Sequence, residues 1–84
     1  MLIYVWNLSP DVSEDNFRQI FEIFGQVSFA IISSTILRDR YNGQSRRFAF
    51  VEMPDLAEAR AAIKTLNKKD LYGQQMIVHA SSEN

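Results

Sequence analysis

Alternating side chains mark two stretches of the chain as strands with two rings on one face. In residues 46–53, RRFAFVEM, Phe48 and Phe50 share a face because successive residues of a strand point to opposite sides. In residues 2–6, LIYVW, Tyr4 and Trp6 share a face for the same reason. Taken alone, residues 46–53 fit a strand buried on both sides as well as a strand whose rings face outward.

Two other stretches have the spacing of amphipathic helices. Residues 13–24 carry apolar side chains at i, i+3, i+4 and i+7, with Ser13 as the N-cap and Gly25 as the C′ residue. A second helix is expected to open at Asp55, which forms an acidic variant of the capping box with Glu58. Its expected buried stripe is Leu56, Ala59, Ala62, Ile63 and Leu66.

The remaining segments are less uniform. Residues 27–37, VSFAIISSTIL, have strand composition, but Ser33-Ser34-Thr35 interrupts the apolar run. One long strand, a bulged strand, and a strand followed by an extra segment all fit this pattern. Asn42-Gly43 predicts a hairpin turn into residues 46–53. Residues 68–75 are expected to be a polar connection, and residues 76–80 a last strand that turns Ile77 and His79 to one face.

The resulting order, β-α-β-β-α-β, predicts an α+β, ferredoxin-like fold. Right-handed crossovers place both helices on one face of a four-stranded antiparallel sheet. The other face is then uncovered, and it is expected to carry Tyr4, Trp6, Phe48 and Phe50. We expect a single domain over residues 1–81, followed by a short polar tail at 82–84.

Composition and charge narrow the classes of function. The 84 residues include no cysteine and a single histidine, His79, which leaves little material for a metal site or a nucleophile-base pair. We therefore expect no enzyme and no cofactor. A net charge of −1 argues against a strong nonspecific polyelectrolyte binder. Four arginines, Arg38, Arg40, Arg46 and Arg47, with Asp39 nonetheless give residues 38–47 a local charge of +3 (four minus one).

Targeting signals give only a default expectation. No charged and then apolar leader opens the sequence, and the longest weakly charged run, residues 27–37, is too short to span a bilayer. The expected location is cytoplasmic, or nuclear if the sequence is a fragment of a eukaryotic protein.

The two ring-bearing stretches resemble the signature motifs of the RNA recognition motif (RRM) family. Ile3-Tyr4-Val5-Trp6-Asn7-Leu8 is similar to the shorter motif, and residues 46–53 are similar to the longer one, K/R-G-F/Y-G/A-F-V-x-F/Y. Leu66-Asn67, Leu71-Tyr72-Gly73 and the closing strand also resemble the family. The chain as a whole looks like small single-RRM bacterial RNA-binding proteins.

The resemblance implies a role for each site residue. Tyr4 and Phe50 would each stack on a base, Phe48 would lie against the sugars or a base between them, and Arg46 would meet a phosphate. The loop arginines would add salt-dependent affinity. The implied partner is single-stranded RNA, with single-stranded DNA as a second ligand class. The further residues expected near the ligand are Trp6, Ile31, Arg40, Arg47, Ile77 and His79.

Several positions depart from the family pattern. Arg47 stands where the longer motif has glycine, so it either adds a charge or obstructs the approach of a ligand. Lys68 and Gln74 also replace residues that are frequent in the family, a glycine and an arginine. Trp6 either extends the stacking platform or packs on a neighbouring loop or the C-terminal tail. His79 either contacts a base or is simply exposed.

Two other functions remain open on the sequence. The same apolar face could bind a protein or a second copy of the chain, and an exposed Ile36-Leu37 edge could pair between chains. A small-molecule or metal-binding ferredoxin-like domain is the third interpretation, but it leaves four aromatics on one face unexplained.

Overall fold

The computed structural model describes residues 1–38, 40–41, 43 and 45–81. The predicted tail and Asn42 of the predicted turn lie outside the described residues. The elements follow one another as β1 (Leu2–Leu8), α1 (Glu14–Glu22), β2 (Phe29–Ile32), β3 (Leu37–Arg38), β4 (Ser45–Glu52), α2 (Leu56–Leu66), β5 (Asp70–Leu71), β6 (Gln74–Gln75) and β7 (Ile77–Ala80). None of the helices in this described part is long and apolar enough to cross a membrane.

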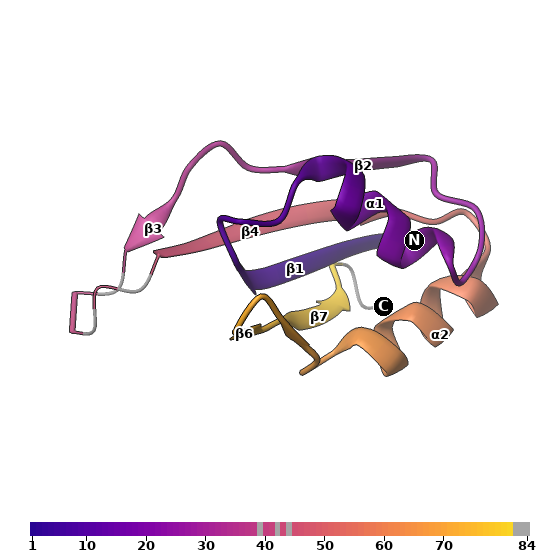
Figure 1. The fold of residues 1–84 in the computed structure, drawn as a ribbon. Helices are drawn as coiled ribbons and strands as arrows, with labels where there is room; N and C mark the ends of the chain where they lie inside the picture. Colours follow the sequence, from indigo (N-terminus) through magenta and orange to yellow (C-terminus); the bar gives the residue numbers. More distant parts are fainter. Residues whose placement is uncertain (39, 42, 44, 82–84) are drawn as a thin grey trace.

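The main sheet has the strand order β2-β4-β1-β7, with antiparallel pairing at every step. Both helices lie on one side of this sheet, and β3 extends it at the far end of β4 (Figure 1). The ferredoxin-like prediction is therefore confirmed. One sheet face is covered by helices and the other is left uncovered.

The hydrophobic core lies between the helices and the sheet. β1 contributes Ile3 and Val5, and β4 contributes Ala49 and Val51, all fully buried. From α1, the rings of Phe17 and Phe21 pack edge to face with centroids 5.2 Å apart. Because strand side chains alternate, burial of these strand residues turns their neighbours in sequence to the uncovered face.

A bulge near the end of β1 changes the alternation. Val5 pairs with Ala49 but Leu8 pairs with Arg47, so β1 holds one extra residue in this interval. Asn7 takes up the bulge with a positive φ of 60°, a conformation that asparagine tolerates better than most residues. Trp6 lies on the uncovered face by ordinary alternation from Tyr4, whereas the bulge returns Leu8 to the core, where it is fully buried.

The first helix begins as predicted but ends earlier. The Ser13 hydroxyl accepts a hydrogen bond from the Asn16 backbone N–H at 3.1 Å, which confirms the N-cap. The C-cap is Ile23, so the prediction of Gly25 as the C′ residue is wrong. Gly25 instead lies in the connection beyond the helix, with a φ of +151°.

The second helix corrects two further predictions. Asp55 is the N-cap and accepts from the Glu58 N–H at 2.9 Å, but the Glu58 carboxylate accepts from the Gln26 N–H at 3.1 Å. In a capping box the Glu58 side chain would accept from the Asp55 backbone N–H. Here it bonds to the segment after α1 instead. Leu56 is 51% exposed, because the first turn of α2 extends past the sheet-facing stripe of Ala59, Ala62 and Leu66.

The ambiguous segment 27–37 is a strand followed by an extra segment, one of the three alternatives open on the sequence. β2 ends at Ile32, and β3 resumes the pairing with β4 through Leu37 opposite Arg46 and Arg38 opposite Ser45. The Ser33 hydroxyl accepts from the Thr35 N–H at 3.1 Å. A serine oxygen that holds the local backbone in this way favours a turn over a continuous strand.

The predicted polar connection 68–75 contains a small hairpin. β5 and β6 pair through Asp70 opposite Gln75 and Leu71 opposite Gln74. Tyr72 and Gly73 form its two-residue turn, both with positive φ, as type I′ hairpins require. The Gly73 N–H also donates to the Asp70 carboxylate at 3.0 Å.

Candidate nucleic-acid interface

Five aromatic rings form one continuous series on the uncovered face of the sheet. His79 on β7 lies 5.8 Å from Tyr4, and Tyr4 lies 5.0 Å from Phe50, measured between ring centroids. Phe50 lies 5.8 Å from Phe48 in an edge-to-face arrangement, and Phe48 lies 5.2 Å from Trp6. We call His79, Tyr4, Phe50, Phe48 and Trp6 the ring series.

Strand register accounts for the order of the rings. Tyr4 stands opposite His79 on one side and opposite Phe50 on the other, since β1 lies between β7 and β4. The same register, continued by one residue from Val5 opposite Ala49, places Trp6 beside Phe48 at the next step along the sheet. The ring series therefore crosses three strands and then continues along β4 to the end of β1.

Aliphatic side chains flank the ring series on both sides. Ile31 on β2 stands opposite Phe50, and Ile77 on β7 stands opposite Trp6. Ile31 is 49% exposed, Ile77 is 38% exposed and Trp6 is 43% exposed. The uncovered face is thus apolar well beyond the rings. Arg46 is exposed, and Phe48 and Phe50 are only half-buried, so the described strand is not buried on both sides.

Trp6 and His79 both lie on the uncovered face, next to other aromatic rings. Trp6 belongs to the ring series and its ring is tilted by 33° to that of Phe48, so the prediction that placed it on the open face is correct. His79 is exposed beside Tyr4, and its Nδ1 lies 3.1 Å from the Ala80 carbonyl oxygen.

A hollow lies at the end of the sheet where the ring series ends at Trp6. Strands β1, β3, β4 and β7 all contribute to its walls. It is lined by Trp6, Asn7, Leu37, Arg38, Arg46, Arg47 and Ile77. The charged lining side chains are all arginines, so this end of the uncovered face favours an anionic group.

The four loop arginines differ in position, and three of them, Arg38, Arg46 and Arg47, line this hollow. Arg46 is exposed on β4, on the same face as Phe48 and Phe50 by alternation, and Arg40 is exposed in the connection between β3 and β4. Arg47 stands opposite Leu8 and is half-buried. Within the described residues, its Nε atom is buried and has no hydrogen-bond partner.

Sequence reasoning did not select Leu37 and Asn7 as site residues and included Arg38 only as one of the loop arginines, although all three residues line the hollow. Asn42-Gly43 predicts the hairpin. Which residues pair across it, and so where the arginines lie on the sheet, depends on the break between β2 and β3. That break, at Ser33-Ser34-Thr35, is visible in the sequence and was the available signal.

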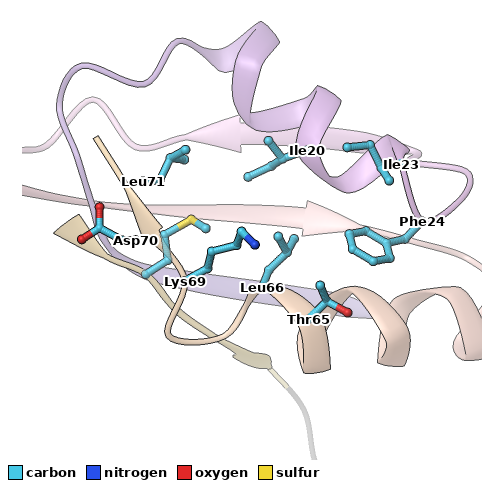
Figure 2. Close-up of a pocket in the computed structure, with 9 residues that line it drawn as sticks. Ile20, Ile23, Phe24, Thr65, Leu66, Lys69, Asp70 and Leu71 are labelled. Carbon is cyan, nitrogen blue, oxygen red and sulfur yellow. The ribbon is translucent and has the colours of Figure 1, made fainter. Parts of the chain in front are cut away.

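A second hollow lies on the opposite side of the molecule, between the ends of the two helices and the β5–β6 hairpin. Figure 2 shows Ile20 and Phe24 approaching Leu66 and Leu71 across it. Its lining is largely apolar, with Lys69 and Asp70 near the hairpin. The ring series contributes nothing to this hollow, so the two faces of the molecule present different chemistry.

Comparison with known proteins adds evidence independent of this geometry. Residues 3–77 match the family model described as RNA recognition motif. Glycine-rich RNA-binding protein 1 of Mycosarcoma maydis is 36% identical over 80 residues, which are 95% of this chain and 43% of that protein. Small ribosomal subunit protein cS22 of Spinacia oleracea is 32% identical over 81 residues, which are 96% of this chain and 30% of that protein. The chain thus spans less than half the length of either relative.

Solved structures give the same result for the fold. The crystal structure of RNA Binding Protein PG1 superimposes with a TM-score of 0.74 at 36% identity, over 100% of this chain and 98% of that one. The structure of Rna15 RRM with bound RNA (GU) has a TM-score of 0.74 at 23% identity, over 98% of this chain and 83% of that one. At that identity the second likeness concerns the fold alone.

Proposed function

The chain belongs to the RNA recognition motif family, and from this membership we propose that its uncovered sheet face binds single-stranded RNA as a non-enzymatic module. The observation that carries the proposal is the ring series, five contiguous aromatic side chains on a face that no helix covers. Single-stranded RNA offers unstacked bases, which stack on such rings while their edges remain available for hydrogen bonds.

Stacking supplies the sequence-tolerant part of the proposed affinity. Each base stacked on an aromatic side chain contributes about 1–3 kcal/mol as judged by alanine substitution. Tyr4 and Phe50 are the proposed platforms for two bases, since their rings are neighbours across β1 and β4. Phe48 is proposed to lie against the sugars or an intervening base.

Arginine side chains supply the proposed electrostatic part. Arg46 shares the face of Phe48 and Phe50 and lines the hollow at the end of the sheet together with Arg38 and Arg47. Guanidinium groups bind phosphate oxygens as charge-assisted, bidentate donors. Most contacts to the phosphates of the RNA backbone are therefore proposed to lie at the β3 end of the uncovered face.

The direct test is binding of a fluorescent pool of short RNA oligomers at low salt. Phe48→Ala with Phe50→Ala removes two rings, and we expect at least a tenfold loss of affinity because one or two stacked bases are lost. Ile23→Ala is the matched control, because Ile23 is an exposed apolar residue on the helix side, 79% exposed. Equal binding by the wild type and the double variant would contradict the proposal.

The same apolar face also suits a second copy of the chain, which is the alternative function. Exposed Ile31 and Ile77 flank the rings, and exposed apolar patches of this kind mark partner surfaces. Sedimentation at high protein concentration separates the two functions. A monomer that binds RNA supports the RNA proposal, whereas a dimer that loses RNA affinity as it forms supports the alternative.

A further inference from the structure

The hollow at the β3 end of the ring series combines two kinds of wall. Trp6, Leu37 and Ile77 form apolar walls, while Arg38, Arg46 and Arg47 provide positive charge. Among the described lining side chains none is acidic. A flat apolar group joined to an anion fits such a site, and a nucleotide has both parts, a base and a phosphate.

Arg47 is the feature that distinguishes this hollow from a general basic patch. Arg47 is one of the residues that line the hollow, and its Nε is buried without a hydrogen-bond partner among the residues that the structure describes. Buried donors without partners are rare in folded proteins. The Nε–H of Arg47 can therefore donate to a phosphate oxygen without first breaking a hydrogen bond to the protein.

Trp6 gives the hollow its continuity with the ring series. One part of its ring system packs beside Phe48, and 43% of the residue remains exposed. A strand of RNA that follows the ring series from Tyr4 toward Phe48 would reach Trp6 next. Trp6 is the last residue of β1 on the uncovered face before the bulge at Asn7, so the ring and the arginines meet at one end of the sheet.

From these observations we propose that the hollow is a subsite for one additional nucleotide of the bound RNA strand. Its base stacks on Trp6 against Ile77, and its phosphate is bound by Arg47 and Arg38. The subsite rests on the proposed RNA binding and extends it. It also gives a function to Arg47 and Trp6, the two positions where the sequence departs from or adds to the family motifs.

The test is a series of oligouridylates lengthened one nucleotide at a time, bound to the intact chain at one low salt concentration. We expect a step in affinity of about tenfold at the length that first fills the subsite, as one additional stacked base would give. Emission from Trp6, the single tryptophan of the chain, should change at the same length. Each variant is first checked for folding by its thermal unfolding curve.

Variants assign the step to its residues. Arg47→Ala and Trp6→Val should each remove the step in affinity. Trp6→Phe should retain most of it because a ring is kept. Arg60→Ala removes the same charge from the exposed surface of α2 and is the matched control.

The outcomes separate this subsite from the proposed function. Short oligomers that bind through the ring series, with no step in the wild type or with the same step in Arg47→Ala and Trp6→Val, would overturn the subsite alone. A Trp6 emission that stays constant along the whole series would do the same. Absence of binding at every length would overturn both the subsite and the RNA proposal.

Discussion

At the scale of single residues, Asn7 decides how the ring series ends. Its positive φ of 60° lies in the bulge that follows Trp6 and returns Leu8 to the core. Its side chain donates to the Gln75 carbonyl at 2.8 Å, and its own carbonyl accepts from the Gln74 side chain at 3.2 Å. One asparagine therefore joins the backbone shape of β1 to the β5–β6 hairpin.

Substitutions at Asn7 should separate the two contributions. Asn7→Gly keeps the positive φ accessible and loses the side-chain bond, which contributes about 0.5–1.5 kcal/mol. Asn7→Ala loses the same bond and also places a Cβ in the left-handed region, so it should cost about 1 kcal/mol more. Urea unfolding measures both. An alanine variant as stable as the glycine variant would show that the backbone conformation is not the constraint.

Residue types explain which site positions were predictable. Alternation alone assigns Tyr4, Phe48 and Phe50 to one face, and their contacts confirm that assignment. Alternation also placed Trp6 on this face, but whether it joins the rings or packs on a loop or the C-terminal tail depends on side-chain packing that alternation cannot show. The partners of Arg47 were unpredictable because its position opposite Leu8 follows from the shifted register.

At the scale of elements, side-chain acceptors from the helix ends hold both edges of the sheet. The Glu14 carboxylate accepts from the Ile32 N–H on β2 at 3.0 Å. The side-chain Oδ1 of Asn67 accepts from the Val78 N–H on β7 at 2.9 Å. Each bond occupies an edge donor that another strand would otherwise use. Dimerisation by edge pairing at β2 or β7 would have to break one of them.

The exit from α1 and the start of α2 are linked by Gly25 and Glu58. A Cβ added at Gly25 would overlap the Glu58 carboxylate, which accepts from the Gln26 N–H. Gly25→Ala should therefore cost about 1–3 kcal/mol, because it adds backbone strain at a φ of +151° and displaces this carboxylate. Thermal or urea unfolding gives the cost.

A double-mutant cycle distinguishes the two causes. In a Glu58→Ala background the overlap is gone, so Gly25→Ala should cost less by at least about 0.5 kcal/mol. Gly73→Ala is the control, since its φ is also positive but no atom lies within 4 Å of the added Cβ. Equal costs of Gly25→Ala with and without Glu58 would contradict the proposed link.

Element boundaries show the limits of local sequence patterns. Cap residues identified the starts of both helices, because Ser13 and Asp55 act on neighbouring N–H groups. The side chain of Glu58 was assigned to the same local motif, but its observed partner, Gln26, is 32 positions away in the sequence. The β5–β6 hairpin was missed because two-residue strands are too short for an alternating pattern, although Tyr72-Gly73 is a turn signal.

At the scale of the whole molecule, the net charge is small, but positive side chains are concentrated at one end of the uncovered face. The net charge is −1, yet Arg38, Arg46 and Arg47 all line the hollow at the β3 end of the ring series. Such a distribution orients a polyanion without binding it strongly at every site. The helix side, in contrast, presents the apolar hollow between α1, α2 and the β5–β6 hairpin (Figure 2).

This separation predicts a shallow salt dependence of RNA binding. If two to four arginines contact phosphates, the logarithm of the association constant should fall with the logarithm of the salt concentration with a slope of roughly −1 to −3. Titrations of one oligomer at several salt concentrations measure it. Arg47→Ala should reduce the slope by about 0.7, one phosphate contact, and Arg60→Ala should leave it unchanged. A much steeper slope would indicate nonspecific binding over the whole surface.

The central claim is that the uncovered face with its ring series is where RNA binds. An NMR titration of the isotope-labelled chain with mixed-sequence RNA tests it most directly. We expect the largest chemical-shift changes at Tyr4, Trp6, Phe48 and Phe50. The signals of Ile20 and Thr65, which line the helix-side hollow, should not change. Shifts confined to the helix side, or no shifts at RNA concentrations well above those of the protein, would contradict it.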